Sequence, residues 1–332
     1  MRNKLVKKAQ RSIRYILEAA SVYVCYRLIR ALPRRVNFSI ASFCGFLMYS
    51  NPFFRKLVKA NLKIVFPEKT EREIGLIARK SFTNLILSFL ELAYFTGRPE
   101  TVKKYVYLPD RINKEINDFH KQGKGFIFVT PHLGNWEIAG MMFANFFSNI
   151  PFAVVARVFP NPYLNKILDL GRLSHGNKVI SAKGAIKGMV QALKEGYFMA
   201  TLIDQNTRVR DGGIFVNFLG LPVPSSRAPA MFARKMNVPV GVGGCVRHGL
   251  KYEVIFEFVH KKIEDYKDDT ELIQDLLKIT ESYIRKYPEQ YLWFYKRFQH
   301  IPMDASEDLI KKYPYYASIP NEKFYRKKGG DS

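Results

Sequence analysis

The order of apolar and polar positions from residue 125 onward predicts alternating strands and helices. Short apolar runs rich in β-forming residues, such as 125–130 (GFIFVT), are bounded by Gly or Pro and have the length of buried strands. Strands are expected at 125–130, 152–155, 178–181, 197–203, 214–218, 238–246 and 252–259. Helical spacing of apolar residues predicts helices at 138–147, 163–173, 185–194, 228–235 and 271–286. This alternation predicts an α/β fold with a mostly parallel or mixed central sheet flanked by helices.

Upstream of this region the apolar pattern is weaker and is mixed with basic charge. Residues 1–14 contain six basic residues and no acidic one, and the apolar stretch 15–32 is broken by Glu18, Arg27 and Arg30. The longest uncharged run in that stretch has eight residues, which is far below the ~20 needed to cross a bilayer.

A second apolar stretch, 36–54, carries no charge over 19 residues but contains six polar or helix-breaking positions. We therefore expect membrane-associating helices that lie in the interface, with the basic leader bound to anionic headgroups. An amphipathic helix packed on the protein's own core and a single spanning helix are the alternatives. Helical periodicity returns at 56–65 and 71–95, and no Pro-, Gly- or Ser-rich linker divides the chain. We predict three parts: a leader and membrane-associating segment at 1–54, a main domain at 55–305 and a C-terminal extension at 306–332.

Charge and composition narrow the classes of function. The chain has 332 residues, 47% of them hydrophobic, and a formal net charge of +24. Such a surplus indicates an anionic partner, which could be nucleic acid, an acidic membrane surface, or an acidic protein or substrate. The basic residues are interleaved with apolar ones, and no zinc-finger spacing, RNA-binding signature or basic heptad array occurs. We therefore expect no nucleic-acid partner.

The cysteines and the missing motifs exclude several kinds of chemistry. Cys25, Cys44 and Cys245 have neither metal-ligand nor redox spacing, which indicates buried thiols in a reducing compartment. The sequence lacks a Gly-rich phosphate loop, a Gly-x-Ser-x-Gly nucleophile motif and a metal-ligand cluster. We expect no metal and no cofactor.

Candidate chemistry gathers around His132. This residue follows the strand 125–130 at its carboxyl end, where ligands bind in parallel α/β sheets. Asn135 stands at the start of the next helix, where it can cap the helix. Glu137 falls in the first turn, where its negative charge interacts favourably with the helix dipole. The turn can fold the Glu137 carboxylate back to one imidazole nitrogen, as a base and its orienting group require. The alternative is a structural His with a capping Glu.

Other polar residues end neighbouring strands. Arg157 could hold an oxyanion or a phosphate, with a surface salt bridge as the alternative. Asp204 ends the strand 197–203, where a parallel sheet gathers its site, or it forms a turn. Arg208 and Arg210 lie on the following loop, where they could bind phosphate groups or be exposed to solvent.

The segment 132–137 (HLGNWE) resembles the catalytic motif of the late acyltransferases of lipid A biosynthesis, within the lysophospholipid acyltransferase superfamily. Four further segments resemble blocks of this family in the same order. They are 61–68 (NLKIVFPE), Arg157 to Arg172 with Asn161-Pro162 between them, Asp204-Gln205 followed by 213–220 (GIFVNFLG), and 290–298 (QYLWFYKRF). Departures are Tyr295-Lys296, where the family has His-Arg, and a more charged N-terminal apolar helix.

The resemblance implies a glycerolipid acyltransferase-like fold at the cytoplasmic face of a bacterial inner membrane. It implies transfer of a fatty acyl chain from acyl-carrier protein to a hydroxyl of an anionic lipid acceptor, a lipid A precursor. The implied catalytic residues are His132, Glu137 and Arg157, and the implied substrate-binding residues are Asn135, Asp204, Gln205, Arg172 and Arg210.

The absence of a candidate Ser or Cys nucleophile favours direct transfer, with His132 as the general base. We expect an apolar groove for the acyl chain, lined partly by 215–221. Two alternatives remain open. The same chemistry could act on a glycerophospholipid, aminolipid or glycolipid, or the chain could be a non-catalytic basic protein that binds membranes.

Overall fold

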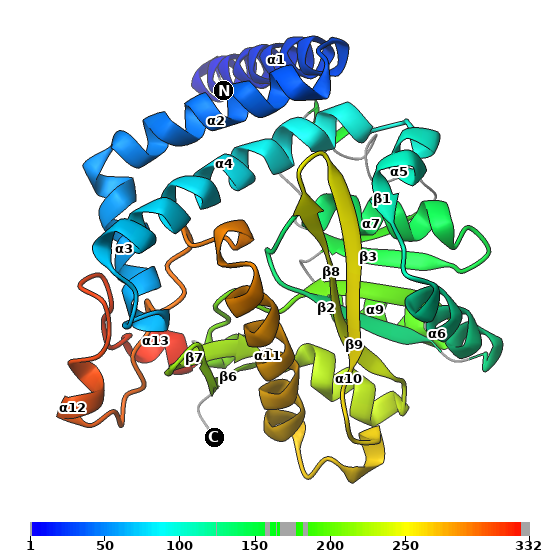
Figure 1. The fold of residues 1–332 in the computed structure, drawn as a ribbon, viewed down its shortest axis with the longest axis vertical. Helices are drawn as coiled ribbons and strands as arrows, with labels where there is room; N and C mark the ends of the chain where they lie inside the picture. The colour runs from blue at the N-terminus through cyan, green and yellow to red at the C-terminus, as the bar shows by residue number, and fades with distance from the viewer. Residues whose placement is uncertain are drawn as a thin grey trace.

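A seven-stranded sheet in the order β1-β9-β8-β2-β5-β3-β4 forms the centre of the molecule (Figure 1). The computed structural model describes residues 2–123, 125–156, 160–163, 165–166, 177–181 and 185–326. The strands are β1 (Val106–Tyr107), β2 (Phe126–Thr130), β3 (Phe152–Ala156), β4 (Lys178–Ser181), β5 (Phe198–Leu202), β8 (Val240–His248) and β9 (Lys251–Phe258). Neighbours are parallel except β8 and β9, which pair antiparallel. The predicted α/β fold with a mostly parallel sheet is confirmed.

The central strands β2 and β5 pair in register from Phe126↔Phe198 to Thr130↔Leu202. Their side chains alternate between two buried clusters: Phe126 and Phe198 belong to one, and Ile127 belongs to the other. Because both faces of these strands are buried, their sequences are apolar throughout.

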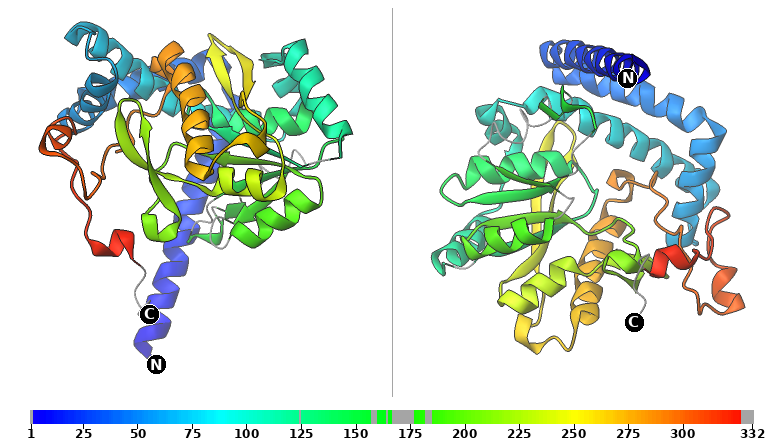
Figure 2. Two further views of the ribbon diagram at one scale, coloured as in Figure 1. Left: turned by 90° about the horizontal axis from the view of Figure 1, so that it is seen from below. Right: turned by 180° about the vertical axis from the view of Figure 1, so that it is seen from behind.

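Helices cover both faces of the sheet (Figures 1 and 2). One buried cluster joins the sheet to α5 (Pro99–Tyr105), α6 (Asp110–Lys121) and α7 (Trp136–Phe146). The other joins it to α9 (Ala185–Lys194), α10 (Ala228–Met236) and α11 (Asp269–Lys286). The helix α7 begins at Asn135, whose side chain accepts a hydrogen bond from the Ile138 N–H at 3.2 Å.

A separate antiparallel hairpin is formed by β6 (Gly213–Phe218) and β7 (Leu221–Ser226). The strand predicted at 214–218 therefore exists, but it lies outside the main sheet. Phe218 and Leu221 are buried in the cluster that contains α11, and Gln274 of that helix donates to the Asn217 carbonyl at 2.8 Å. The hairpin thus packs beside the helical layer.

The first four helices of the described chain are α1 (Arg2–Ala31), α2 (Arg34–Ser50), α3 (Pro52–Val65) and α4 (Glu71–Phe95). The helix α4 begins at a capping box formed by Thr70 and Glu73. Figure 2 shows α2 running along α4, while the N-terminal half of α1 projects beyond the body of the molecule. Within the described ranges, no helix combines the length and the hydropathy that a membrane span requires.

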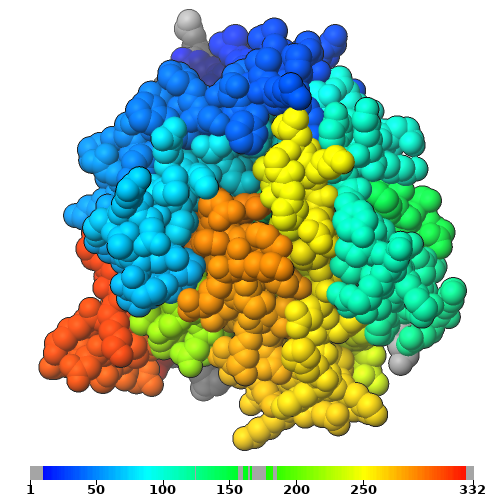
Figure 3. Space-filling model, in the orientation of Figure 1, coloured from blue at the N-terminus to red at the C-terminus, as the bar shows by residue number. Residues whose placement is uncertain are grey.

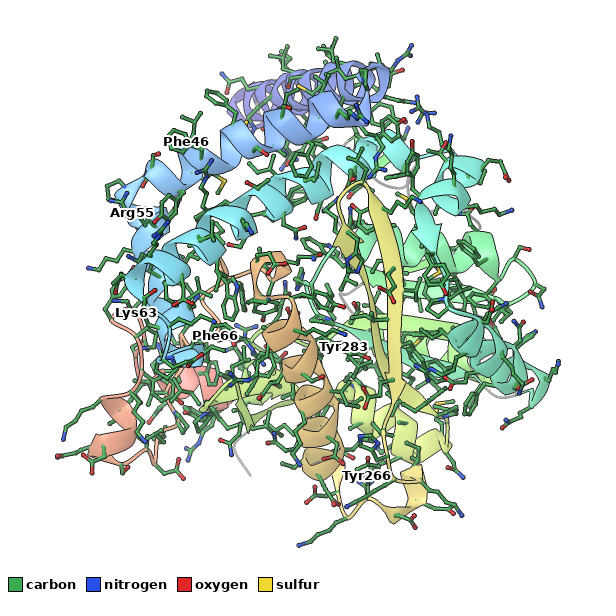
Figure 4. The ribbon with its side chains drawn as sticks, in the orientation of Figure 1. Phe46, Arg55, Lys63, Phe66, Tyr266 and Tyr283 are labelled. Atoms are coloured by element: carbon green, nitrogen blue, oxygen red, sulfur yellow. The ribbon has the colours of Figure 1, made fainter. Side chains whose placement is uncertain are left out.

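The closing segment 290–298 is held against α3. Asn61 donates to the carbonyls of Trp293 at 2.7 Å and Tyr295 at 3.0 Å. Phe66, labelled where α3 ends in Figure 4, lies edge-on to Trp293 with 6.0 Å between ring centroids. The rest of the described chain contains α12 (Glu307–Ile310) and α13 (Glu322–Tyr325), and its orange to red surface lies next to that of α3 in Figure 3. Tyr316 of this part donates to the Asn61 side chain.

Candidate active site

His132 lies in a tight turn between β2 and α7, at the carboxyl end of a central strand. The turn is fixed on β8, because Asn135 N donates to Cys245 O at 2.9 Å. Gly134 has a φ of +62°, and a Cβ added there would stand 1.9 Å from Cys245 O, so only glycine fits. The His132 carbonyl accepts from Leu292 N at 3.1 Å. The imidazole is thereby held in place, with 7% of the residue exposed.

Side chains of α4 support this turn from the other side. Asn84 Nδ2 donates to Gly134 O at 3.0 Å and to Gln290 O at 3.0 Å. Ser88 Oγ donates to the same Gly134 carbonyl at 3.1 Å. The turn is therefore bonded to α4, β8 and the closing segment.

Glu91, also in α4, is a buried carboxylate that joins several elements. It pairs with Arg34 of α2 and Arg247 of β8, and it accepts from the Tyr252 hydroxyl. Its Oε2 lies 3.4 Å from Asn135 Nδ2. Asn135, predicted to bind substrate, is fully buried and caps α7.

His132 pairs with Asp204. Nδ1 lies 2.8 Å from Asp204 Oδ1, and the His132 backbone N donates to Oδ2 at 2.8 Å. An ionised carboxylate can only accept, so Nδ1 carries the proton and Nε2 keeps its lone pair. Nε2 lies 3.4 Å from the side-chain nitrogen of Gln205. This is the arrangement of a base and its orienting carboxylate.

Burial and charge act on this pair in opposite directions. Burial alone would lower the pKa of His132, but the charge and hydrogen bond of Asp204 and the charge of Glu137 outweigh it and raise that pKa above its ordinary value. Burial alone would raise the pKa of Asp204, but His132 and Arg297 bring it below its ordinary value. The site therefore holds an ionised carboxylate beside a base of increased proton affinity.

Asp204 contacts Nδ1 of the imidazole, a role predicted from the sequence for Glu137. The reason is strand register: Thr130 pairs with Leu202, and His132 and Asp204 each stand two residues further along adjacent parallel strands. Glu137 lies in the first turn of α7 and lines the same cavity as His132. Its charge, after the charge and hydrogen bond of Asp204, contributes to raising the pKa of His132.

Of the remaining predicted site residues, Gln205 lies at the site, Arg210 does not line the cavity, and two fall outside the described residues. Arg157 and Arg172 fall outside the described residues. Gln205 is exposed beside the imidazole. Arg210, in the short 3-10 helix η1 (Val209–Asp211), lies 3.9 Å from a carboxylate oxygen of Asp211.

A cavity of about 480 Å³ opens beside His132. Its walls are mainly apolar side chains of β2, β3, β5, β9, α6 and α7, among them Ile116, Phe128, Phe143, Phe152, Val154 and Phe256. Trp136 lies edge-on to His132 with 4.9 Å between ring centroids. Gly140 lines the cavity, and a Cβ added there would meet nothing within 4 Å. The cavity therefore runs along α7 and suits a long apolar chain.

The predicted contribution of residues 215–221 to this cavity is wrong. The side chains of Phe218 and Leu221 are buried in the cluster with α10 and α11, whereas the cavity walls Phe143 and Phe256 belong to the opposite cluster. An aromatic-rich segment cannot be assigned to a cavity until the structure shows whether both lie on the same side of the sheet.

Comparisons with known proteins find a matching family and several similar proteins. The family described as bacterial lipid A biosynthesis acyltransferase matches residues 5–300. The lipid A biosynthesis lauroyltransferase of Escherichia coli (strain K12) is 25% identical over 297 residues, covering 87% of this chain and 93% of that protein. The palmitoleoyltransferase of the same organism is 24% identical over 263 residues, or 77% of this chain and 83% of that protein. The lipid A biosynthesis myristoyltransferase of the same organism is 23% identical over 249 residues, covering 73% of this chain and 74% of that protein.

Proposed function

Since this chain belongs to the bacterial lipid A biosynthesis acyltransferases, and is therefore an acyltransferase, we propose that it moves a fatty acyl chain from acyl-carrier protein to a hydroxyl of a lipid A precursor. In this proposal His132 is the general base and Asp204 orients it. The observation that carries the proposal is the His132–Asp204 pair at the opening of an apolar cavity.

The reaction follows from the state of the imidazole. His132 Nε2 takes the proton of the acceptor hydroxyl as the hydroxyl oxygen attacks the thioester carbonyl. The ionised Asp204 stabilises the imidazolium that forms. When the tetrahedral intermediate collapses, the C–S bond breaks and the imidazolium returns its proton to the departing thiolate. Arg157, which follows β3 in the sequence, stays the proposed oxyanion partner.

The cavity supplies the acyl site in this proposal. Its apolar walls remove the methylene groups of the donor chain from water, at about 0.8 kcal/mol for each group. Gly140 leaves the passage along α7 open, because it places no side chain there. The thioester carbon then lies near His132 and Glu137 at the polar end.

The first two helices provide the proposed membrane contact, at the cytoplasmic face of the inner membrane. Large apolar side chains are exposed on both, among them Ile13, Leu17, Leu28, Phe43 and Leu47. Burying one such side chain is worth about 1.5–3 kcal/mol, and a basic residue near anionic lipid adds about 1 kcal/mol. The charge of +24 suits both an acidic carrier protein and a phosphorylated acceptor.

A transfer assay with purified protein tests the proposal. The enzyme is given acyl-loaded carrier protein and a lipid A precursor, and the acylated product is followed by mass spectrometry. His132→Ala should lower turnover by about 10²- to 10⁴-fold without loss of folding. Near-normal turnover in folded His132→Ala protein would remove the base from the mechanism. Lipids from a deletion strain test the acceptor, since accumulation of an intact lipid A precursor supports it and a change confined to phospholipids contradicts it.

A further inference from the structure

Arg297, in the closing segment 290–298, is a buried cation bonded only to neutral groups. Its Nη1 donates to Asn206 Oδ1 at 2.7 Å and to Pro224 O at 3.2 Å, and its Nη2 donates to Ser225 Oγ. Its Nε has no hydrogen-bond partner, and in the described part of the chain no carboxylate oxygen lies within 4.0 Å. Arg297 is 2% exposed. Burying a guanidinium without a nearby negative charge is costly.

Asp204 is the matching buried anion, also 2% exposed. Its oxygens accept from the backbone N and from Nδ1 of His132. Both donors are neutral while His132 is unprotonated. Across the described ranges, no Lys or Arg nitrogen lies within 4.0 Å of this carboxylate.

Two short stretches of chain bring these charges together. Asn206, two residues after Asp204, accepts from Arg297, and its backbone N donates to the Tyr295 hydroxyl at 2.9 Å. Tyr291, whose pKa is raised by burial and by the charge of Asp204, precedes Arg297 in the same closing segment. The charge of Arg297 helps to lower the pKa of Asp204, as expected for neighbouring opposite charges.

We propose that Arg297 is a positioning residue for the reaction, which supplies the counter-charge of Asp204 and so sets the pH at which His132 accepts a proton. This inference rests on the proposed role of His132 as the base. With Arg297 present, the three side chains carry no net charge until His132 gains a proton and they become positive. Without Arg297, proton uptake takes the pair from negative to neutral, which is electrostatically easier. Glu137, the other acidic group that acts on the imidazole, stays in place.

Arg297→Met and Asp204→Asn should therefore shift activity in opposite directions along the pH axis. The value of kcat/KM rises as His132 loses its proton. In Arg297→Met this rise should move to higher pH by about one pH unit, because a positive charge is lost. In Asp204→Asn any remaining activity should rise at lower pH, because a negative charge is lost. A purely structural role for Arg297 predicts less folded enzyme with an unmoved pH profile.

Arg297→Lys is the matched control at the same position. It keeps the charge but loses the planar fork that reaches both Asn206 and Ser225. Its stability should fall while its pH profile stays near that of the wild type. Arg234→Met, which removes a positive charge that pairs with Asp269 away from the site, should leave the profile unchanged.

A second readout separates this inference from the proposed function. The His132 ring can be titrated by NMR with labelled histidine, without any substrate. If Arg297→Met does not fold, Asn206→Asp places a carboxylate on the guanidinium and should raise the midpoint as well. An unmoved or lowered midpoint in the folded variants would overturn the role of Arg297. An active His132→Ala enzyme would overturn the proposed base instead, while the ring titration would still decide the counter-charge.

Discussion

The Asp204→Asn substitution tests the catalytic pair most directly, because the surrounding donors dictate how the amide must lie. Oδ2 of Asp204 accepts from the backbone N of His132, and Oδ1 accepts from Nδ1. The backbone N–H still needs an acceptor in the variant, so the amide oxygen stays there and the amide nitrogen faces Nδ1. An NH₂ group can only donate, so it forces the imidazole proton onto Nε2. The lone pair that should take the substrate proton is then lost.

The expected loss is about 10²- to 10⁴-fold in kcat, the usual contribution of a positioned base. The volume of the side chain is unchanged, so the cavity and the KM for the acyl donor should change little. Any remaining activity should rise at lower pH, because the anion that raises the pKa of His132 is gone while burial still lowers it. The assay is kcat and kcat/KM against pH with acyl-loaded carrier protein.

Asp211→Asn provides the control, since Asp211 lies in the loop after the same strand and pairs with exposed Arg208. It should behave like the wild type. Folded Asp204→Asn protein with more than about one tenth of wild-type kcat would refute the role of Asp204 as the orienting group.

Three further predictions concern the cavity, the supporting network and the membrane contact. Gly140→Leu should shorten the preferred donor chain by several carbons without lowering thermal stability, since Leu is favoured over Gly in a helix by roughly 0.8 kcal/mol; an unchanged profile across donor lengths would show that the cavity is not the acyl site. Glu91→Gln should cost about 3 kcal/mol in urea unfolding, because Arg34 and Arg247 lose their shared carboxylate; a loss below about 1 kcal/mol would contradict a coupled network. Phe43→Asp should weaken binding to anionic vesicles several-fold, whereas Met303→Asp, at a similarly exposed residue after the closing segment 290–298, should not; equal effects would place the membrane contact elsewhere.

The features that could be predicted from the sequence depend on local patterns. The strand 125–130, the Gly134 turn and the capping Asn135 stand within a dozen residues of one another, so periodicity and turn chemistry suffice to place them. Pairing between distant segments leaves no such local pattern. Asp204 is 72 residues from His132, and its role as orienting group appears only when β5 is known to lie beside β2.

Glu91 illustrates a signal that was present but not specific. It is the only acid in the apolar run 85–95, and a lone acid in such a run is consistent with a buried ion pair. Its partners come from α2, which holds Arg34, and from the β8–β9 hairpin, where Arg247 and Tyr252 are register partners. No spacing rule connects Glu91 or Arg34 to that hairpin, since tertiary packing alone brings these parts together.

The geometry of the pair makes the reaction centre a consequence of strand register. Thr130 and Leu202 are paired, and each chain continues two residues to His132 and Asp204. One residue along a strand corresponds to about 3.3 Å, and a change of one residue also reverses the side-chain direction. An insertion in either short connection would therefore separate Nδ1 from Oδ1 by more than a hydrogen bond can span. The hydrogen bonds from α4, β8 and the closing segment to this turn thus stabilise the Nδ1–Oδ1 distance, which the pairing of the two strands has already determined.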